Sequence, residues 1–326
     1  MSTKDKVLLE LENNKDKFIS GSALAKKLNV SRNAIWKAIK SLESSGCIID
    51  AVTNKGYRLL KASDKISAEA IKSLLTTSYM GREIEILQKI DSTNNYAKEI
   101  AKSNAIKQGY TIISETQTAG KGRMGRSFES PPDTGIYMSI ILRPNFSIEL
   151  TQLLTSCVAV AVADAVDRLY NTDTKIKWVN DLFLNSKKYC GILTEASISF
   201  ESGQLEYAII GIGINAKSIK NSLSPEVLEI ATSIEDECDK TVTRNTLIAE
   251  ILNSLEKYIE NIESKNFMNE YRKCSFIIGE TVIVTSNGES KKALAVDIDD
   301  NAGLVVRYEN GTTETLNSGE ARIIKS

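Results

Sequence analysis

The sequence predicts an α+β protein with three parts: a small head of helices and a hairpin, a central α/β domain, and an all-β tail. Three observations carry this prediction. Residues 1–62 show short helical patterns followed by two strand-like segments, residues 66–272 alternate strand-like and helical patterns, and residues 274–326 hold short strands separated by turn residues. A chain of 326 residues is long enough for two or three domains. We therefore place the domain limits at these three ranges.

The composition narrows the chemistry that the chain can perform. It contains no histidine, so histidine triads and histidine metal sites are excluded. The five cysteines are odd in number, widely spaced and mostly set among apolar residues, which is typical of reduced thiols rather than of disulfides or zinc ligands. No apolar run reaches the roughly 18 residues of a membrane span, and the first residues lack the apolar core of a signal peptide. We therefore expect a cytoplasmic protein with no membrane partner.

Charge is unevenly distributed along the chain. The whole chain has a net charge of −1, but residues 1–62 hold 12 Lys or Arg against 6 Asp or Glu and so carry +6. The rest of the chain therefore carries −7. A basic head on an acidic body indicates a nucleic-acid-binding module joined to a domain with a different activity.

The head resembles a winged helix-turn-helix in its order of elements. Apolar residues recur at helical spacing in three segments, and Ser22 and Ser31 can cap the second and third helices. Asn29-Val30 forms a tight turn between these two helices, and residues 47–50 and 56–60 form the strands of the wing. A small helical module for protein interaction remains the alternative.

The third helix of the head is the predicted recognition helix. Arg32 and Asn33 lie near its N-terminus, where recognition helices meet base edges, whereas lysines further along suit phosphates. Trp36 flanks the apolar stripe, and we expect it to pack rather than to contact bases. The expected DNA contacts are Ser31, Arg32, Asn33, Lys37 and Lys40 from the helix, with Lys55 and Arg58 from the wing.

The most distinctive segment is the loop at residues 118–126. Its three glycines alternate with three cations, Lys121, Arg123 and Arg126. Glycines allow backbone N–H groups to approach a ligand closely, and the cations supply donors for phosphate or carboxylate oxygens. The loop lies between two strand-like segments, which favours a binding site over a solvated basic turn. It is not a Walker loop, because no Gly-Lys-Ser/Thr closes it.

Two further segments are compatible with ligand binding. Residues 91–97 combine hydroxyls and amides, which can hydrogen-bond a neutral polar ligand such as a urea, although a plain helix cap explains Ser92 or Thr93 equally well. In residues 207–215, glycine alternates with isoleucine, so that one strand face leaves room for a ligand or for a closely packed backbone.

Taken together, these segments resemble the bifunctional biotin–protein ligases that also repress biotin synthesis genes. The resemblance spans essentially the whole chain, and its five motifs stand in the family's order and spacing. It implies a winged head, a class II synthetase-like central domain with a mixed sheet, and an SH3-like β-barrel as the tail. The motifs are Asp91-Ser92-Thr93-Asn94, Gln117-Thr118-Ala119-Gly120-Lys121-Gly122-Arg123, Lys177-Trp178-Val179-Asn180-Asp181, Gly191-Ile192-Leu193-Thr194-Glu195 and Gly211-Ile212-Gly213-Ile214-Asn215.

This resemblance implies a biotin–[acetyl-CoA-carboxylase] ligase. Biotin, ATP and Mg²⁺ would yield biotinyl-5′-adenylate, and a lysine of a biotin carboxyl carrier protein would then accept the biotinyl group. Biotin would also act as corepressor, because its adenylate would order the loop and promote a homodimer whose two heads bind an operator with inverted repeats.

Residue roles follow from the same resemblance. Lys177 and Arg123 are the expected catalytic residues, while the metal ligands and the role of Asp181 stay unassigned. The expected contacts to biotin or its adenylate are Ser92, Thr93, Asn94, Gln117, Lys121, Gly122, Arg123 and Lys177, and those to the nucleotide are Arg126, Phe128, Lys188 and Asn215.

Three residues depart from the family's usual pattern. Lys121 stands where arginine is usual, Val179 where proline is usual, and Phe128 where tryptophan is more common. These changes bear on affinities rather than on the reaction class. Two alternatives stay open: a biotin-sensing regulator with little ligase activity, and a lipoate or octanoate transferase-like enzyme, which would explain the head and the polar cluster less well.

Overall fold

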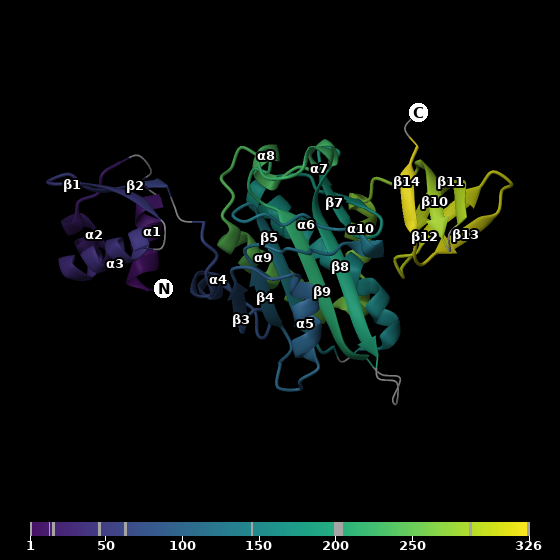
Figure 1. Ribbon diagram of the computed structural model, residues 1–326, viewed down its shortest axis with the longest axis horizontal. Helices are drawn as coiled ribbons and strands as arrows, with labels where there is room; N and C mark the ends of the chain where they lie inside the picture. Colours follow the sequence, from purple (N-terminus) through teal and green to yellow (C-terminus); the bar gives the residue numbers. More distant parts are fainter. Residues whose placement is uncertain are drawn as a thin grey trace. The chain divides into compact units, whose positions relative to one another are not determined.

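The structure, a computed structural model, describes residues 2–12, 14, 17–44, 47–61, 64–144, 146–198, 205–286 and 289–324. The chain divides into two compact units, residues 1–73 and 74–326 (Figure 1). Because this division separates only two units, the three domain limits given above stay a prediction.

The first unit consists of helices followed by a hairpin, as the sequence predicts. The apolar stripes of its three helices meet in one core, in which Val7, Leu24, Ile35 and Leu42 are each at most 1% exposed. The elements are α1 (Thr3–Glu12), α2 (Gly21–Leu28), α3 (Arg32–Ser44), β1 (Ile48–Val52) and β2 (Gly56–Lys61), followed by α4 (Ala68–Leu74). Strands β1 and β2 pair antiparallel to form the wing.

Local capping explains where the helices of the head begin. Ser31 caps α3 as predicted, with its Oγ accepting from a backbone N–H at 3.1 Å. The prediction for α2 is wrong by two residues: Ser20, not Ser22, accepts from the N–H of Ala23 at 3.1 Å, and Ser22 lies inside the helix. Asn29 adopts the left-handed conformation, φ 54°, that ends α2 and forms the predicted turn.

A seven-stranded mixed sheet forms the centre of the second unit. Its strand order is β3-β4-β5-β9-β8-β7-β6; β3 runs parallel to β4, and the other neighbours are antiparallel. The strands are β3 (Ile84–Leu87), β4 (Tyr110–Ser114), β5 (Gly135–Leu142), β6 (Lys175–Lys177), β7 (Asp181–Leu184), β8 (Lys187–Ile198) and β9 (Leu205–Asn215).

Helices cover this sheet and supply most of the remaining core. Helix α6 (Thr151–Tyr170) packs against α9 (Arg244–Glu260) and the sheet, while α5 (Thr93–Ala101) lies against β4, β5 and β9 (Figure 1). Shorter elements complete the unit: η1 (Arg123–Gly125), η2 (Ile148–Leu150), α7 (Pro225–Ile230), α8 (Ile234–Glu237), η3 (Ile262–Ser264) and α10 (Phe267–Cys274). No helix in the described ranges is both long and apolar enough to cross a membrane.

The tail of the chain forms a five-stranded antiparallel sheet in the order β13-β12-β11-β10-β14. Its strands are β10 (Thr281–Ser286), β11 (Glu289–Ile298), β12 (Leu304–Tyr308), β13 (Thr313–Leu316) and β14 (Glu320–Ile323). The edge strands β13 and β14 are not paired with each other among the described residues, so the sheet is open here. Short strands are present in this range as predicted, and β13 and β14 each hold only one buried residue.

The five cysteines form no disulfide, as expected. Cys157 and Cys190 are buried in the second unit, and burial raises the pKa of both thiols. These two cysteines therefore act as apolar packing residues.

Candidate functional site

A cavity of about 630 Å³ opens on one face of the central sheet. It gathers residues from segments that are far apart in the sequence, including the glycine-rich loop, α5, β6 to β9 and β14. All of the residues assigned above to biotin, its adenylate or the nucleotide line it: Ser92, Thr93, Asn94, Gln117, Lys121, Gly122, Arg123, Arg126, Phe128, Lys177, Lys188 and Asn215.

Strand register builds the floor of this cavity. Tyr137, Gly213, Gly191, Asp181 and Lys177 lie opposite one another in a single row across β5, β9, β8, β7 and β6. Directly opposed residues point to the same face of a sheet. The row therefore places two glycines in the middle of the floor and two charged side chains at one end.

The glycines of β9 make room for side chains that border the cavity. A Cβ at Gly211 would lie 2.3 Å from Oδ1 of Asn94, and one at Gly213 would lie 2.8 Å from the ring of Phe128. Both distances are far below normal contact. The alternation of glycine and isoleucine therefore allows close packing of the chain's own side chains, one of the two explanations that the sequence left open. Both glycines also line the cavity, and the second explanation, room for a ligand, stays a prediction.

The N-terminus of α5 supplies a buried, neutral polar wall. The Thr93 backbone N–H donates to Oε1 of Gln117 at 2.8 Å. The Ser139 hydroxyl lies 2.6 Å from Oδ1 of Asn94, whose amide donates to Oε2 of Glu195 at 2.9 Å. These fixed amides and hydroxyls offer donors and acceptors in defined directions, which suits a neutral polar ligand.

Ser92 also acts as the cap of α5, accepting from the Asn95 N–H at 3.5 Å. Capping and lining the cavity are therefore compatible at this residue.

The cations of the glycine-rich loop at residues 118–126 contact different parts of the chain. Arg123 donates to Oδ1 of Asn180 at 3.1 Å and to the Gly319 carbonyl at 3.2 Å. Arg126 pairs with Glu320 at 2.6 Å, so both arginines reach residues that border the tail sheet.

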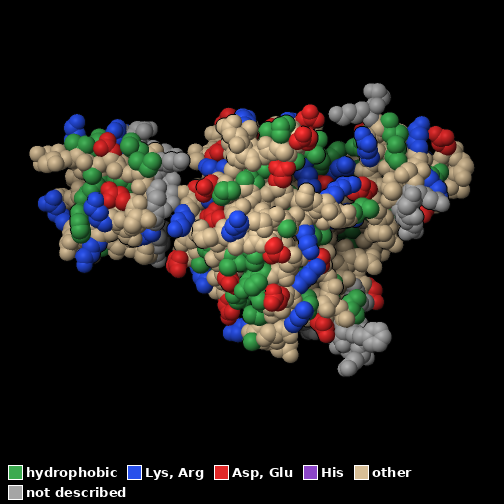
Figure 2. Space-filling view, in the orientation of Figure 1, with side chains coloured by type: hydrophobic (Ala, Val, Ile, Leu, Met, Phe, Trp, Pro, Cys, Tyr) green, Lys and Arg blue, Asp and Glu red, His purple; other side chains and the backbone are tan. Residues whose placement is uncertain are grey.

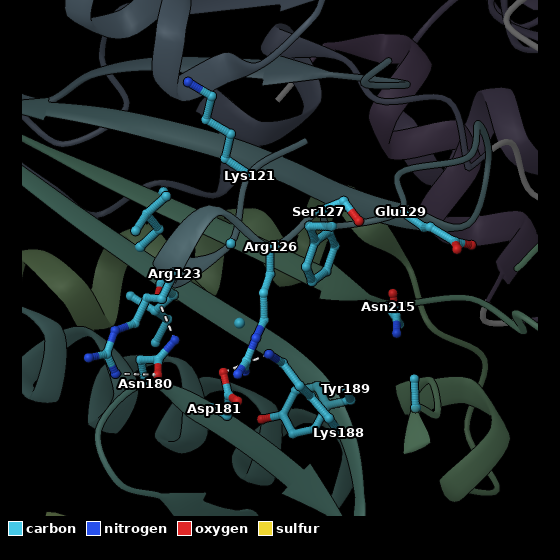
Figure 3. A pocket seen from close by; sticks show the side chains of 18 of the residues that line it. Lys121, Arg123, Arg126, Ser127, Glu129, Asn180, Asp181, Lys188, Tyr189 and Asn215 are labelled. Atoms are coloured by element: carbon cyan, nitrogen blue, oxygen red, sulfur yellow. Dashed lines mark hydrogen bonds and ion pairs between the residues drawn. The ribbon is translucent and has the colours of Figure 1, made fainter. Parts of the chain in front are cut away.

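Lys121 extends away from the two arginines (Figure 3), and its Nζ donates to Oδ1 of Asn95 at 2.6 Å. The sequence grouped these three cations, whereas the structure brings only the two arginines together.

Two lysines of the cavity, Lys188 on β8 and Lys177 on β6, differ in their partners. Nζ of Lys188 lies 2.6 Å from Oδ1 of Asp181, toward which it points in Figure 3. Lys177 is half-buried at the end of β6, and among the described residues no acceptor lies within hydrogen-bonding distance of its ammonium group. Lys177 is therefore free to bind an anion that enters the cavity.

The remaining predicted residues lie on the side of β9 and α7. The rings of Phe128 and Tyr137 meet edge to face with centroids 6.3 Å apart. Burial raises the pKa of Tyr137 to about 12, so its hydroxyl stays neutral at physiological pH. The amide of Asn215, 6% exposed, donates to the Thr232 carbonyl at 3.0 Å.

No pattern in the sequence indicated the residues that the tail contributes to the cavity. Gly319 and Glu320 lie in and after a turn with no motif, far along the chain from the loop that they contact. The Trp178 indole donates to the Ala302 carbonyl at 2.8 Å and helps to hold the tail sheet beside the cavity. Asn180 belonged to a motif already singled out, but its contact with Arg123 was not foreseen.

The described residues contain no group of three or more Asp, Glu, Cys or His side chains that could hold a metal.

In the first unit, the predicted DNA contacts of α3 are exposed. Arg32, Asn33 and Lys37 face solvent, and Lys40 does so while pairing with Glu43 at 2.7 Å. Trp36 lies on the same exposed surface with 51% of its area accessible, so the expectation that it packs is wrong.

The two predicted DNA contacts of the wing, Lys55 and Arg58, differ in how accessible their side chains are. Lys55 is exposed, with its Nζ 5.9 Å from the ring centre of Phe18. Arg58 is half-buried: it pairs with Asp50 at 2.8 Å and stacks 4.6 Å from the same ring. Arg58 thus holds the wing together in this structure, and its contact with DNA stays a prediction.

The fold and the site define a ligase of the biotin/lipoate class. The profile of the biotin/lipoate A/B protein ligase family matches residues 86–215, an HTH-domain profile matches residues 3–58, and the profile of the biotin protein ligase C-terminal domain matches residues 277–322. The solved biotin protein ligase from Aquifex aeolicus, in complex with biotin and ATP, shares the fold, with a TM-score of 0.62 at 23% identity over 75% of this chain and 100% of that chain.

Two bacterial relatives show which family within this class the chain belongs to. The bifunctional ligase/repressor BirA of Bacillus subtilis is 38% identical over 267 residues, covering 82% of this chain and 81% of its own. The protein of the same name from Bacillus spizizenii is 35% identical over 314 residues, covering 95% and 96%. This chain belongs to the family of bifunctional biotin–protein ligase/repressors.

Proposed function

We propose that the chain is an ATP-dependent biotin–protein ligase that also represses transcription of biotin synthesis or transport genes. In the first half-reaction, a carboxylate oxygen of biotin attacks the α-phosphorus of ATP, and pyrophosphate leaves. In the second, the amine of a lysine on a biotin carboxyl carrier protein attacks the carbonyl carbon of the adenylate, and AMP leaves.

One observation carries this function. A single cavity combines a buried, neutral hydrogen-bonding wall with a loop bearing two arginines and with Lys177, a lysine free of acceptors among the described residues. The neutral wall suits the ureido ring of biotin, and the cations suit the carboxylate and phosphates that must react. Joining two anions requires positive charge where their repulsion and the charge on phosphorus develop.

The residue roles follow this division. Ser92, Thr93, Asn94 and Gln117 bind the ureido group and nearby ring atoms. Lys177 holds the carboxylate against the α-phosphate and stabilises the charge that grows there.

The loop then closes over the adenylate. Lys121, Gly122 and Arg123 cover it and shield the mixed anhydride from water. Arg123 must leave Asn180 or share it with the ligand, because its guanidinium donates to both Asn180 and the Gly319 carbonyl in this structure.

The nucleotide occupies the side of the cavity formed by Arg126, Phe128, Lys188 and Asn215. The cations face the phosphates, and Phe128 and Asn215 approach the adenine. Phe128 already rests edge to face on Tyr137, so one face of its ring can stack on a base.

Mg²⁺ fits this cavity as an ion that arrives with ATP. Magnesium is commonly held by one or two carboxylates together with substrate phosphates, and it needs no all-protein cage. Asp181 on the cavity floor is a suitable carboxylate, although Lys188 now pairs with it. When bound, the ion would offset charge on the phosphates.

Repression rests on the head and on assembly. The exposed basic face of α3 and the wing bind operator DNA in the cytoplasm, and the adenylate promotes a homodimer through the central sheet so that two heads reach two half-sites. The finer fold assignments, a class II synthetase-like centre and an SH3-like tail, agree with this function and belong to the same proposal.

The test is mass spectrometry of a purified biotin carrier domain incubated with the full chain, biotin and Mg-ATP. We expect a gain of one biotin on one lysine. Binding of biotin in calorimetry without transfer would instead assign the role of a biotin-sensing regulator. Neither binding nor transfer would refute biotin as the substrate.

A further inference from the structure

The exposed side of α3 carries a large apolar residue that the fold does not use. The opposite side of the helix, with Ile35, Ile39 and Leu42 at 1% exposure, already provides its core contacts. Trp36 is 51% exposed and is not among the described apolar residues that pack against the core of the first unit. No acceptor for its indole N–H occurs among the residues that the structure describes. Trp36 is therefore available to contact a partner, a use for which the amphipathic indole is well suited.

Helical spacing places Trp36 in the middle of the basic face. Arg32, Trp36 and Lys40 follow one another at intervals of four residues, and Asn33 and Lys37 run alongside them. All are exposed. Figure 2 shows Lys and Arg side chains over α2 and α3, with hydrophobic side chains among them.

This mixture fits the major groove of DNA better than a protein partner. Phosphates match the cations on the rim of the face, and thymine is the base that presents an apolar group, its C5-methyl, in the major groove. A second head would bring the same positive charge against this face. The net charge of +6 on residues 1–62 therefore favours a polyanion.

We propose that Trp36 is a specificity-determining residue of α3 that contacts a thymine C5-methyl group, while Lys37 and Lys40 meet phosphates on either side. Arg32 and Asn33 remain available for polar base edges near the helix N-terminus. This inference rests on the proposed repressor function and extends it by naming a base and the atom that is read.

The first experiment removes only the methyl group. A duplex is selected from a randomised library by the wild-type full-length chain with biotin and Mg-ATP, and each thymine of the selected duplex is then replaced in turn by uracil. We expect at least one replacement to weaken wild-type binding about fourfold, the factor for burying one methyl-sized group. In Trp36→Ala the same replacement should have no effect.

Lys37→Ala is the matched control on the same face. It should weaken binding to every duplex and lower the salt slope by about one, yet keep the sensitivity to uracil. Trp36→Ala should leave the salt slope and the biotinylation rate unchanged, because the side chain lies outside the ligase cavity and outside the core.

A second experiment observes Trp36 directly. The chain has two tryptophans, and Trp178 is only 4% exposed, so the emission that acrylamide quenches in the wild type belongs to Trp36. The selected duplex should protect this emission from quenching.

The outcomes separate this inference from the function on which it rests. A duplex that binds tightly, tolerates every uracil in the wild type and leaves Trp36 open to acrylamide would overturn the inference and leave the repressor intact. A dimerisation defect in Trp36→Ala with unchanged DNA binding would assign the surface to a protein contact and overturn the inference as well. Recovery of no duplex would overturn the repressor function and the inference together.

Discussion

Replacing Gly211 with alanine is expected to displace Asn94, a residue of the polar wall that we propose binds biotin. The new methyl group would lie 2.3 Å from Oδ1 and 2.8 Å from Cγ of Asn94, a side chain that is 4% exposed. Asn94 cannot move aside freely, because it is hydrogen-bonded to Ser139 at 2.6 Å, to Glu195 at 2.9 Å and to the Leu193 carbonyl at 3.3 Å.

The magnitude follows from these contacts. Each hydrogen bond that is broken costs about 1 kcal/mol, and forcing a methyl group into a packed region costs about 1–3 kcal/mol. Because Asn94 can relieve part of the overlap by giving up some of its bonds, we expect Gly211→Ala to lower the free energy of unfolding by about 2–3 kcal/mol. Displacement of Asn94 should also weaken biotin binding by about tenfold, which corresponds to roughly 1.4 kcal/mol.

Urea denaturation and biotin calorimetry measure the two effects, and Asn94→Ala provides the control background. Without the amide of Asn94 the overlap disappears, so in that background Gly211→Ala should cost less than about 1 kcal/mol. If the full penalty persists there, or if the single variant is as stable as wild type, the overlap with Asn94 is not what requires glycine at this position.

Three further predictions concern other parts of the second unit. Lys177→Ala should slow pyrophosphate release about 10²–10³-fold with an unchanged circular dichroism spectrum; a wild-type rate would remove Lys177 from the mechanism. Arg244 is 1% exposed and lies 2.8 Å from Glu115, so Arg244→Met should destabilise the protein by about 3–5 kcal/mol, because it removes one partner of a buried ion pair. A loss of less than about 1 kcal/mol on urea denaturation would contradict this reasoning. Burial raises the pKa of the Tyr137 hydroxyl from 10.0 to about 12, so this group loses its proton at lower pH in the unfolded chain than in the folded one, and the free energy of unfolding should fall as pH rises through that range. Tyr137→Phe should therefore lose less stability than wild type between about pH 8 and about pH 11. Equal losses in the two proteins would contradict the raised pKa.

Local patterns in the sequence determined much of the fold. The inner face of α3, with Ile35, Ala38, Ile39 and Leu42, has the helical period, and all four residues are buried as predicted. The two wing strands, predicted at residues 47–50 and 56–60, are observed at Ile48–Val52 and Gly56–Lys61. Periodicity of this kind reports which face is buried, and burial is the main force that selects these elements.

Prediction from the sequence was wrong or incomplete where short-range signals compete. Ser20 and Ser22 are both plausible caps two residues apart, and only the path of the chain before α2 decides between them. Trp36 flanks an apolar stripe and was therefore expected inside, but the core of the head is already filled by its neighbours. Strands β13 and β14 carry too few buried residues to show alternation.

The motifs identified most of the ligand-binding candidates that line the cavity, because each motif needs particular side chains or glycines at a fixed spacing, whereas Arg126, Phe128 and Lys188 lie outside the five motifs. What the sequence alone could not provide is the arrangement between segments. Strand register places Lys177 and Asp181 in one row with Gly191 and Gly213, and the folding of the tail brings Glu320 to Arg126. Such contacts depend on the packing of the whole unit, since residues nearly 200 positions apart leave no periodic or local signal in the chain.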